Sequence, residues 1–255
     1  MKKSIIILVV LFTFIGSFQL KAQTAEEIVS TYLEALGGEE NLSKIKTLTF
    51  TCSAKAQGMD IPITMYQKAP GLQRMDMNFQ GKVITQMAFD GTEAWGTNFM
   101  TMEAEKWDAQ RSAMLKVETD FMDSFLGWKE KGYSISLEGE EDIEGTPCYK
   151  IKLTKAPLTI DGESVENFSY CFFEKESSAM IMERSFQKEG EAKGMITETF
   201  MGDYEEVDGY IFAHTITQKM SGQVVFSLTI DKIEIDKELE EDFFSFPAAS
   251  AEDKK

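Results

Sequence analysis

The chain has 255 residues, a formal net charge of −17 at pH 7, and a hydrophobic fraction of 43%. The hydrophobic fraction is sufficient for one sizeable core, and the acidic balance disfavours binding to nucleic acid and static adsorption to anionic membranes. We therefore expect one acidic domain that has no nucleic acid among its partners.

Residues 1–22 have the pattern of a secretory signal peptide. Lys2 and Lys3 precede an apolar run that ends at Phe18, and Ala22 offers a small residue for cleavage. The run is shorter than the roughly 20 residues that a membrane-spanning helix needs. No Cys occurs before Cys52, so the acylated Cys of a bacterial lipoprotein is not present. These features predict export to a periplasm and cleavage near Ala22.

The segment after the signal peptide is predicted to be a helix over residues 24–36. It begins with a capping box formed by Thr24 and Glu27, and Gly37 and Gly38 end it. Its apolar residues recur at helical spacing and form one stripe, which is made of Ile28, Val29, Tyr32, Leu33 and Leu36. This helix therefore has one face to bury.

Runs of alternating hydrophobicity between turn residues predict an antiparallel meander of about 12 strands. The Asp208-Gly209 pair is a strong hairpin signal because Gly readily adopts the positive φ of a tight turn. The fold class is therefore mainly β, with a single domain over 23–247 and a disordered tail over 248–255. The strands are expected at 47–57, 60–68, 72–79, 82–90, 93–98, 133–140, 146–155, 164–174, 179–188, 193–203, 210–220 and 223–235.

Residues 105–126 interrupt the strands with a helical pattern. Apolar side chains recur there at three- and four-residue steps, and charged residues lie between them. We expect this helix to act as a lid over the concave face of the sheet, through Met114, Leu115, Phe121, Met122, Phe125 and Leu126.

Methionine is unusually frequent on the predicted strand faces. One interpretation is an ordinary core that contains Met; the other is an apolar concavity that accepts flexible ligands such as acyl chains, because Met adapts to different shapes. On the second interpretation, Met180 and Met182 share a strand face, as do Met75 and Met77. The expected cavity-lining residues are Met75, Met77, Met87, Phe89, Trp95, Met180, Met182, Met195 and Met201.

The sequence does not predict an enzyme, a metal site or a cofactor. The one histidine, His214, has no second His or Cys near it in sequence, and the common nucleotide-binding, metalloprotease and hydrolase motifs are absent. Cys148 and Cys171 fall opposite each other if residues 156–163 form a simple loop, so they could form a disulfide or remain two buried thiols.

Several motifs together resemble the family of the periplasmic lipoprotein carrier LolA. Lys68 to Arg74 is similar to its K-x-P-x-x-x-R strand start, and Asp90 to Trp95 is similar to its D-G-x-x-x-W hairpin. The corner with Asp208-Gly209 and the end Phe243 to Pro247 resemble its C-terminal part. One departure is Ala69, which stands where the carrier typically has an Arg that helps to operate the lid.

The resemblance implies a half-open antiparallel β-barrel of about 11–12 strands, wrapped around helices that close an apolar cavity for acyl chains. It implies a monomeric carrier or chaperone for lipoproteins or other lipids, with membrane-bound donor and acceptor proteins as partners. The alternative is an extracytoplasmic protein-interaction module whose core is filled by its own side chains.

Overall fold

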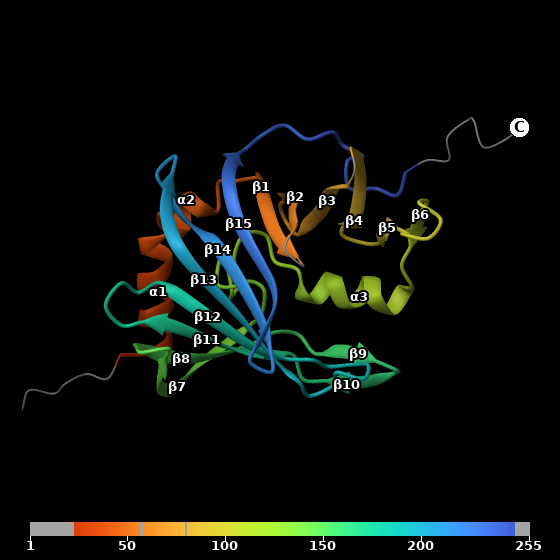
Figure 1. The fold of residues 1–255 in the computed structure, drawn as a ribbon. Coiled ribbons are helices and arrows are strands. Elements are labelled where there is room, and N and C mark those ends of the chain that lie inside the picture. The colour runs from red at the N-terminus through yellow and green to blue at the C-terminus, as the bar shows by residue number, and fades with distance from the viewer. Residues whose placement is uncertain (1–22, 57–58, 80, 248–255) are drawn as a thin grey trace, which may run out of the picture.

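The computed structural model describes residues 23–56, 59–79 and 81–247 (Figure 1). The predicted signal peptide and the predicted C-terminal tail lie outside these residues. Among the residues described, no helix has the length and apolar character needed to cross a membrane.

Among the described residues, one large antiparallel sheet of 13 strands forms the body of the fold, and a separate pair of strands, β9 and β10, forms a small hairpin. The sheet order is β6-β5-β4-β3-β2-β1-β15-β14-β13-β12-β11-β8-β7, so β6 and β7 are its two ends. The strands are β1 (Thr47–Ala56), β2 (Met59–Lys68), β3 (Leu72–Phe79), β4 (Lys82–Phe89), β5 (Ala94–Thr97), β6 (Ala104–Lys106), β7 (Ser134–Ile143), β8 (Thr146–Thr154), β9 (Leu158–Ile160), β10 (Glu163–Val165), β11 (Phe168–Glu174), β12 (Met180–Phe186), β13 (Ile196–Val207), β14 (Tyr210–Met220) and β15 (Gln223–Ile235).

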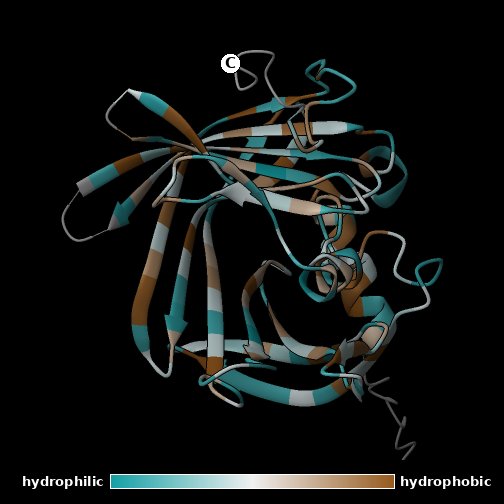
Figure 2. Cartoon of the chain, turned by 90° about the vertical axis from the view of Figure 1, so that its right-hand side faces the viewer, coloured by the Kyte–Doolittle hydropathy of each residue, from teal (hydrophilic) through white to brown (hydrophobic). Residues whose placement is uncertain are grey.

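The sheet is strongly curved but not closed, because its end strands do not pair with each other. Figure 1 shows α1 (Ala25–Ala35) along one end of the curved sheet and α3 (Ala109–Glu118) at its open side. Figure 2, turned by 90°, shows how the strands curve around several sides of the fold. The predicted half-open, mainly β architecture is therefore confirmed, with somewhat more strands than expected.

Helix α1 forms for the local reasons that its sequence indicates. The Thr24 side chain accepts a hydrogen bond from the Glu27 N–H at 3.2 Å, and the Glu27 carboxylate accepts one from the Thr24 N–H at 2.9 Å. Two donors at the helix start are satisfied in this way. After the helix, Gly37 adopts a φ of 127°, and the short helix α2 (Glu39–Leu42) leads into β1.

The β13–β14 corner holds the C-terminal end of α1. Asp208 and Gly209 both have positive φ, 53° and 86°, as the tight turn requires. Just after the turn, the Ile211 N–H donates to the Leu36 carbonyl oxygen at 3.0 Å. The hairpin predicted from Asp208-Gly209 is therefore confirmed, and it joins helix and sheet.

The inserted helix is shorter than the sequence pattern predicts. Helix α3 ends at Glu118, and residues 119–133, here called the inserted segment, continue without a regular helix. Met122 has a positive φ of 65°, and the Asp123 carboxylate accepts a hydrogen bond from the Phe125 N–H at 2.7 Å. This side-chain bond offers the backbone an alternative to helical bonding.

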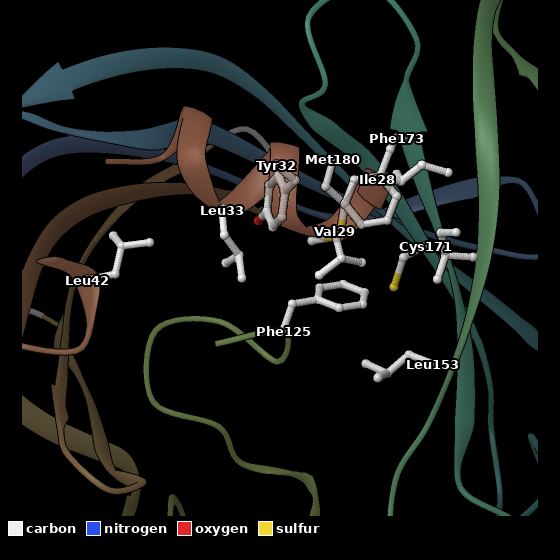
Figure 3. Packing of buried hydrophobic residues seen from close by; sticks show 11 residues of the cluster. Ile28, Val29, Tyr32, Leu33, Leu42, Phe125, Leu153, Cys171, Phe173 and Met180 are labelled. Carbon is white, nitrogen blue, oxygen red and sulfur yellow. The ribbon is translucent and has the colours of Figure 1, made fainter. Parts of the chain in front are cut away.

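The prediction that Phe121, Met122, Phe125 and Leu126 lie on the helix was therefore wrong, although they do pack inward. Phe125 is buried among Tyr32 and Phe173, with ring centroids 6.2 Å and 5.4 Å away. Figure 3 shows it beside side chains from α1 and the sheet. Met122 packs against this cluster and also against a second one on β1, β2 and β15. The inserted segment thus joins two parts of the curved sheet.

The outer face of the sheet is also packed at β3, β4 and β5, where the C-terminal segment of the chain covers it. Arg74 and Trp95 both pair with Ala88 and therefore share one face, whereas the adjacent Met75 points to the other. The segment after β15 covers this face, and the Trp95 Nε1–H donates to the Phe244 carbonyl oxygen at 2.9 Å. We call this group the back-face clamp; it consists of Arg74, Asp76, Thr85, Trp95, Phe243, Phe244 and Phe246.

Candidate functional site

A cleft of about 760 Å³ lies between α3 and the inner face of the sheet. Its walls carry polar and charged side chains together with Met and aromatic residues. The lining comprises Met75, Gln86, Met87, Trp107, Arg111, Met114, Leu115, Glu118, Ser124, Lys155, Asn167, Phe168, Ser169, Glu183, Ser185, Phe186, Gln187, Lys188, Glu189, Thr197 and Gln218.

A smaller apolar pocket of about 300 Å³ lies deeper, between the inserted segment, α1 and the sheet. Ser124 and Glu183 line both hollows, so the apolar pocket adjoins the polar cleft. Its lining is Tyr32, Leu36, Leu42, Phe50, Met65, Gln67, Met122, Asp123, Ser124, Phe125, Leu153, Cys171, Met180, Glu183, Met201, Tyr204, Ile211, Phe212, Ala213, Ile216 and Ile230.

A buried acid and two tyrosines stand in the wall of the apolar pocket. The Tyr32 hydroxyl donates to Asp123 Oδ2 at 2.6 Å. Burial raises the pKa of the Asp123 carboxyl, and the bonds from Tyr32 and from the Phe125 N–H offset part of this effect. Burial raises the pKa of Tyr204 as well, and its hydroxyl donates to the Met180 carbonyl oxygen at 2.6 Å. Both phenols therefore stay protonated and act as donors.

A second acid, Asp120, ties the inserted segment to the sheet. Lys155 Nζ lies 2.6 Å from Asp120 Oδ2, and Lys131 Nζ lies 2.8 Å from Oδ1. Burial would raise the pKa of Asp120, but the two ammonium groups outweigh it and lower the pKa below its usual value. On the other side of the segment, Gln73 Nε2 donates to Thr119 Oγ1 at 2.8 Å. The segment is thus held on both sides of the cavity.

Several predicted cavity residues face the hollows. Met75 and Met87 pair with each other across β3 and β4, and both line the cleft. Met180 and Met201 line the apolar pocket. Of the predicted lid residues, Met114 and Leu115 line the cleft, and Met122 and Phe125 line the pocket. Phe121 and Leu126 instead pack in the two neighbouring clusters.

The remaining predicted cavity residues lie elsewhere. Met77 and Phe89 are buried, and neither lines the cleft or the apolar pocket. Met195 precedes β13 and is 40% exposed, so it belongs to the surface. Trp95 lies in the back-face clamp, where its ring packs at 5.9 Å from Phe246. Its placement in the cavity was wrong because alternation along a strand does not say which face becomes concave.

Met182 faces away from the cavity because of a bulge. Phe172 pairs with Met182 but Phe173 pairs with Met180, so β12 has one extra residue, Ile181, at this point. The bulge turns Met180 and Met182 to opposite faces, contrary to the expectation that they share one. Met182 is buried with Phe172 in a separate cluster.

The cysteines are buried thiols, and the histidine contacts the backbone. All three cysteines are free and buried. In the β8–β11 pairing, Cys148 faces Glu174 and Cys171 faces Ile151, so the disulfide considered from the sequence does not form. Burial raises the pKa of Cys52 to about 12 and that of Cys148 to about 11. His214 Nδ1 lies 3.1 Å from the Phe212 carbonyl oxygen.

Within residues 23–56, 59–79 and 81–247, no group of three or more His, Cys, Asp or Glu side chains could hold a metal ion. Two basic residues of the cleft are held in ion pairs: Lys188 Nζ lies 3.1 Å from Glu118 Oε1, and Lys155 Nζ lies 2.6 Å from Asp120 Oδ2.

At the level of sequence, no protein family matches the chain. No curated protein matches it either. Solved structures do match in fold. A LolA superfamily protein from Nitrosomonas europaea has a TM-score of 0.55 at 12% identity, covering 88% of this chain and 98% of its own. The protein has a LolA-type fold.

Two further structures agree with this assignment. A DUF1329 family protein from Desulfovibrio piger has a TM-score of 0.54 at 12% identity, over 86% of this chain and 96% of that one. A domain assigned to outer membrane lipoprotein sorting from Vibrio parahaemolyticus also has a TM-score of 0.54 at 12% identity, over 85% and 97%. The resemblance proposed from the sequence motifs is therefore confirmed for the fold.

The LolA-type fold brings together pocket residues that the sequence did not single out. Asp123 and Tyr32 meet although 91 positions separate them, and Ile211 and Ala213 come from the strand that follows the corner. One signal was available: Asp120 and Asp123 lie beside the apolar residues Phe121, Met122 and Phe125, and an acid that is buried with such neighbours needs partners.

Proposed function

We propose that this protein is an extracytoplasmic carrier that binds the acyl chain of a lipid or lipoprotein. The observation that supports the proposal best is the apolar pocket that adjoins a wider polar cleft through Ser124 and Glu183. An amphiphile needs both environments, one for its chain and one for its head. The volumes, about 300 Å³ and 760 Å³, fall in the range of small-molecule sites.

The chemistry of the pocket also favours a chain over a compact ligand. Met122, Met180 and Met201 line it from three different segments, and Met side chains repack around ligands of different shape. No pair of groups suited to nucleophilic catalysis lies among the described pocket residues, and the buried phenols of Tyr32 and Tyr204 remain neutral. Binding without chemical conversion is therefore the proposed activity.

The first test measures affinity against chain length. Each buried methylene contributes about 0.8 kcal/mol, so each added methylene should tighten binding about fourfold until the pocket is full. The measurement is titration calorimetry with a series of saturated fatty acids. Affinity that does not change with chain length would contradict the proposal and would favour a protein-interaction module.

Two methionines provide a matched pair of variants. Met201 lines the pocket, whereas Met195 is 40% exposed and outside it. Met201→Lys should abolish binding because an unpaired ammonium in an apolar pocket is costly, and Met195→Lys should leave affinity unchanged. If the Met201 variant fails to fold, Ala213→Phe provides a second test: it fills the pocket without adding charge and should also weaken binding. Equal effects of the Met201 and Met195 substitutions in folded protein would contradict the assignment.

A further inference from the structure

The wall of the cleft near α3 and β12 carries basic side chains in a protein whose net charge is −17. Arg111, Lys155 and Lys188 all line the cleft. Lys155 is paired with Asp120, at 2.6 Å, and Lys188 with Glu118, at 3.1 Å. Arg111 has no ion pair among the described residues. Arg111 is therefore the one of the three that has no ion-pair partner in the part of the cleft that the structure describes.

The guanidinium of Arg111 is nevertheless held in position. Its Cζ atom lies 3.4 Å from the centre of the Trp107 ring, which also lines the cleft. Stacking on an aromatic ring orients the planar group and leaves its N–H edge available. Such an edge matches the two oxygens of a carboxylate or phosphate, to which it donates parallel hydrogen bonds.

Asn167, a residue that also lines the cleft, carries a second donor without a partner among the described residues. Its residue is only 5% exposed, and its Oδ1 accepts a hydrogen bond from Lys188 Nζ at 2.6 Å. Because an ammonium can only donate, the atom that faces Lys188 must be the oxygen, and this fixes the direction of the amide. Nδ2 is buried and has no hydrogen-bond partner among the described residues. A buried N–H without an acceptor is unfavourable unless a ligand supplies one.

We infer that the cleft binds the oxyanion head of an amphiphile, a carboxylate or a phosphate, through Arg111 and the Nδ2 amide of Asn167. The inference rests on the proposed function, in which the chain of the same molecule occupies the apolar pocket. Ser169 and Thr197 add hydroxyl groups to the lining. The acidic surface elsewhere repels anions, so local cations are needed to hold such a head group.

The acids of the cleft are compatible with this arrangement. Glu118 is paired with Lys188, and Glu189 is exposed at the rim. Glu183 stands at the junction with the apolar pocket. A carboxylate at this junction disfavours deeper entry of an anionic head. The ligand is therefore oriented with its chain inward and its head in the cleft.

The test compares three probes of equal chain length: palmitate, palmitoyl lysophosphatidate and the neutral hexadecanol. Arg111→Gln should weaken binding of at least one anionic probe about tenfold or more and leave hexadecanol unchanged, because only charged heads use the guanidinium. Asn167→Asp keeps an oxygen for Lys188 but replaces the free donor by an acceptor, so it should weaken the same probe. Lys116→Gln removes a charge from an exposed position on the same helix and should have no effect.

The outcomes separate this inference from the proposed function. If no probe binds, the carrier proposal fails and the head-group site fails with it. If all three bind with similar affinity and the Arg111 and Asn167 variants behave like the Lys116 control, the carrier stands and the head-group site is overturned. A loss confined to palmitate assigns the site to carboxylates, and a loss confined to lysophosphatidate assigns it to phosphates. Thermal melting of each variant verifies that it is folded.

Discussion

The two sides of the sheet differ in how completely their buried polar groups are partnered. In the back-face clamp, Arg74 donates to Asp76 at 2.9 Å, to Thr85 Oγ1 at 3.0 Å and to the Phe243 carbonyl oxygen at 2.9 Å. Its guanidinium also lies 4.6 Å from the centre of the Phe243 ring. On the concave face, the pKa of Asp123 is raised by burial and Asn167 Nδ2 has no partner among the described residues.

This difference separates residues that hold the fold from residues that are available to a ligand. Three of the motifs that resemble the LolA family, the Arg74 strand, the Trp95 hairpin and the Phe243 to Pro247 end, meet in the clamp, whereas the Asp208-Gly209 corner lies at the end of α1. They do not meet at the cleft. A motif can therefore identify this fold without identifying what it binds, and Ala69, at the start of the first motif, packs in the core cluster of β1, β2 and β15.

The largest expected change in the free energy of unfolding comes from a substitution in the back-face clamp. Arg74→Met would leave Asp76, whose side chain is 11% exposed, without its partner, and should lower the free energy of unfolding by about 3–5 kcal/mol. Urea denaturation provides the measurement. As a control, Lys129→Met removes an ion pair whose lysine side chain is 57% exposed and should cost less than about 1 kcal/mol. Similar small losses for both variants would show that the clamp is not a structural centre.

A smaller change in the free energy of unfolding, this time a gain, is expected from a substitution on the concave side. The folded pKa of Asp123 is raised, so its favourable contribution is present below the unfolded value of 3.8 and is lost as the pH rises through the folded pKa. Asp123→Asn retains an acceptor for the Phe125 N–H and removes the buried charge. The variant should therefore be more stable than the original protein at neutral pH, and this difference should disappear below pH 3.8.

Urea denaturation of both proteins across this pH range measures the difference directly. Asp120, whose pKa is lowered, is present in both proteins, so its own loss of stability in acid cancels in the comparison. A variant that is less stable at every pH would mean that the Asp123 carboxylate is required for the inserted segment to fold.

The smallest change in the free energy of unfolding is expected at His214, which lies outside the clamp and outside the cleft and apolar pocket. His214 is partly buried and its ring nitrogen lies 3.1 Å from a backbone carbonyl oxygen. His214→Ala should change the free energy of unfolding by about 1 kcal/mol or less and leave fatty-acid affinity unchanged. A loss of binding by folded protein would place His214 in the site and would weaken the division between the two faces.

The sequence by itself determined the elements whose causes are local. The capping box of Thr24 and Glu27 starts α1, and the positive φ at Gly209 makes the predicted hairpin. Alternation along the chain identified most strands of the sheet because the side-chain period of a strand is fixed by its geometry. The order of the motifs also identified the type of fold.

Only the tertiary structure decided which side chains face the cavity. One extra residue, Ile181, turns Met182 outward, and the β9–β10 hairpin replaces the simple loop that would have aligned Cys148 with Cys171. The inserted segment leaves the helix after Glu118 and bonds Asp123 to Tyr32 instead. These outcomes depend on strand register and on partners distant in sequence, and a shift of one residue reverses the face of every side chain that follows.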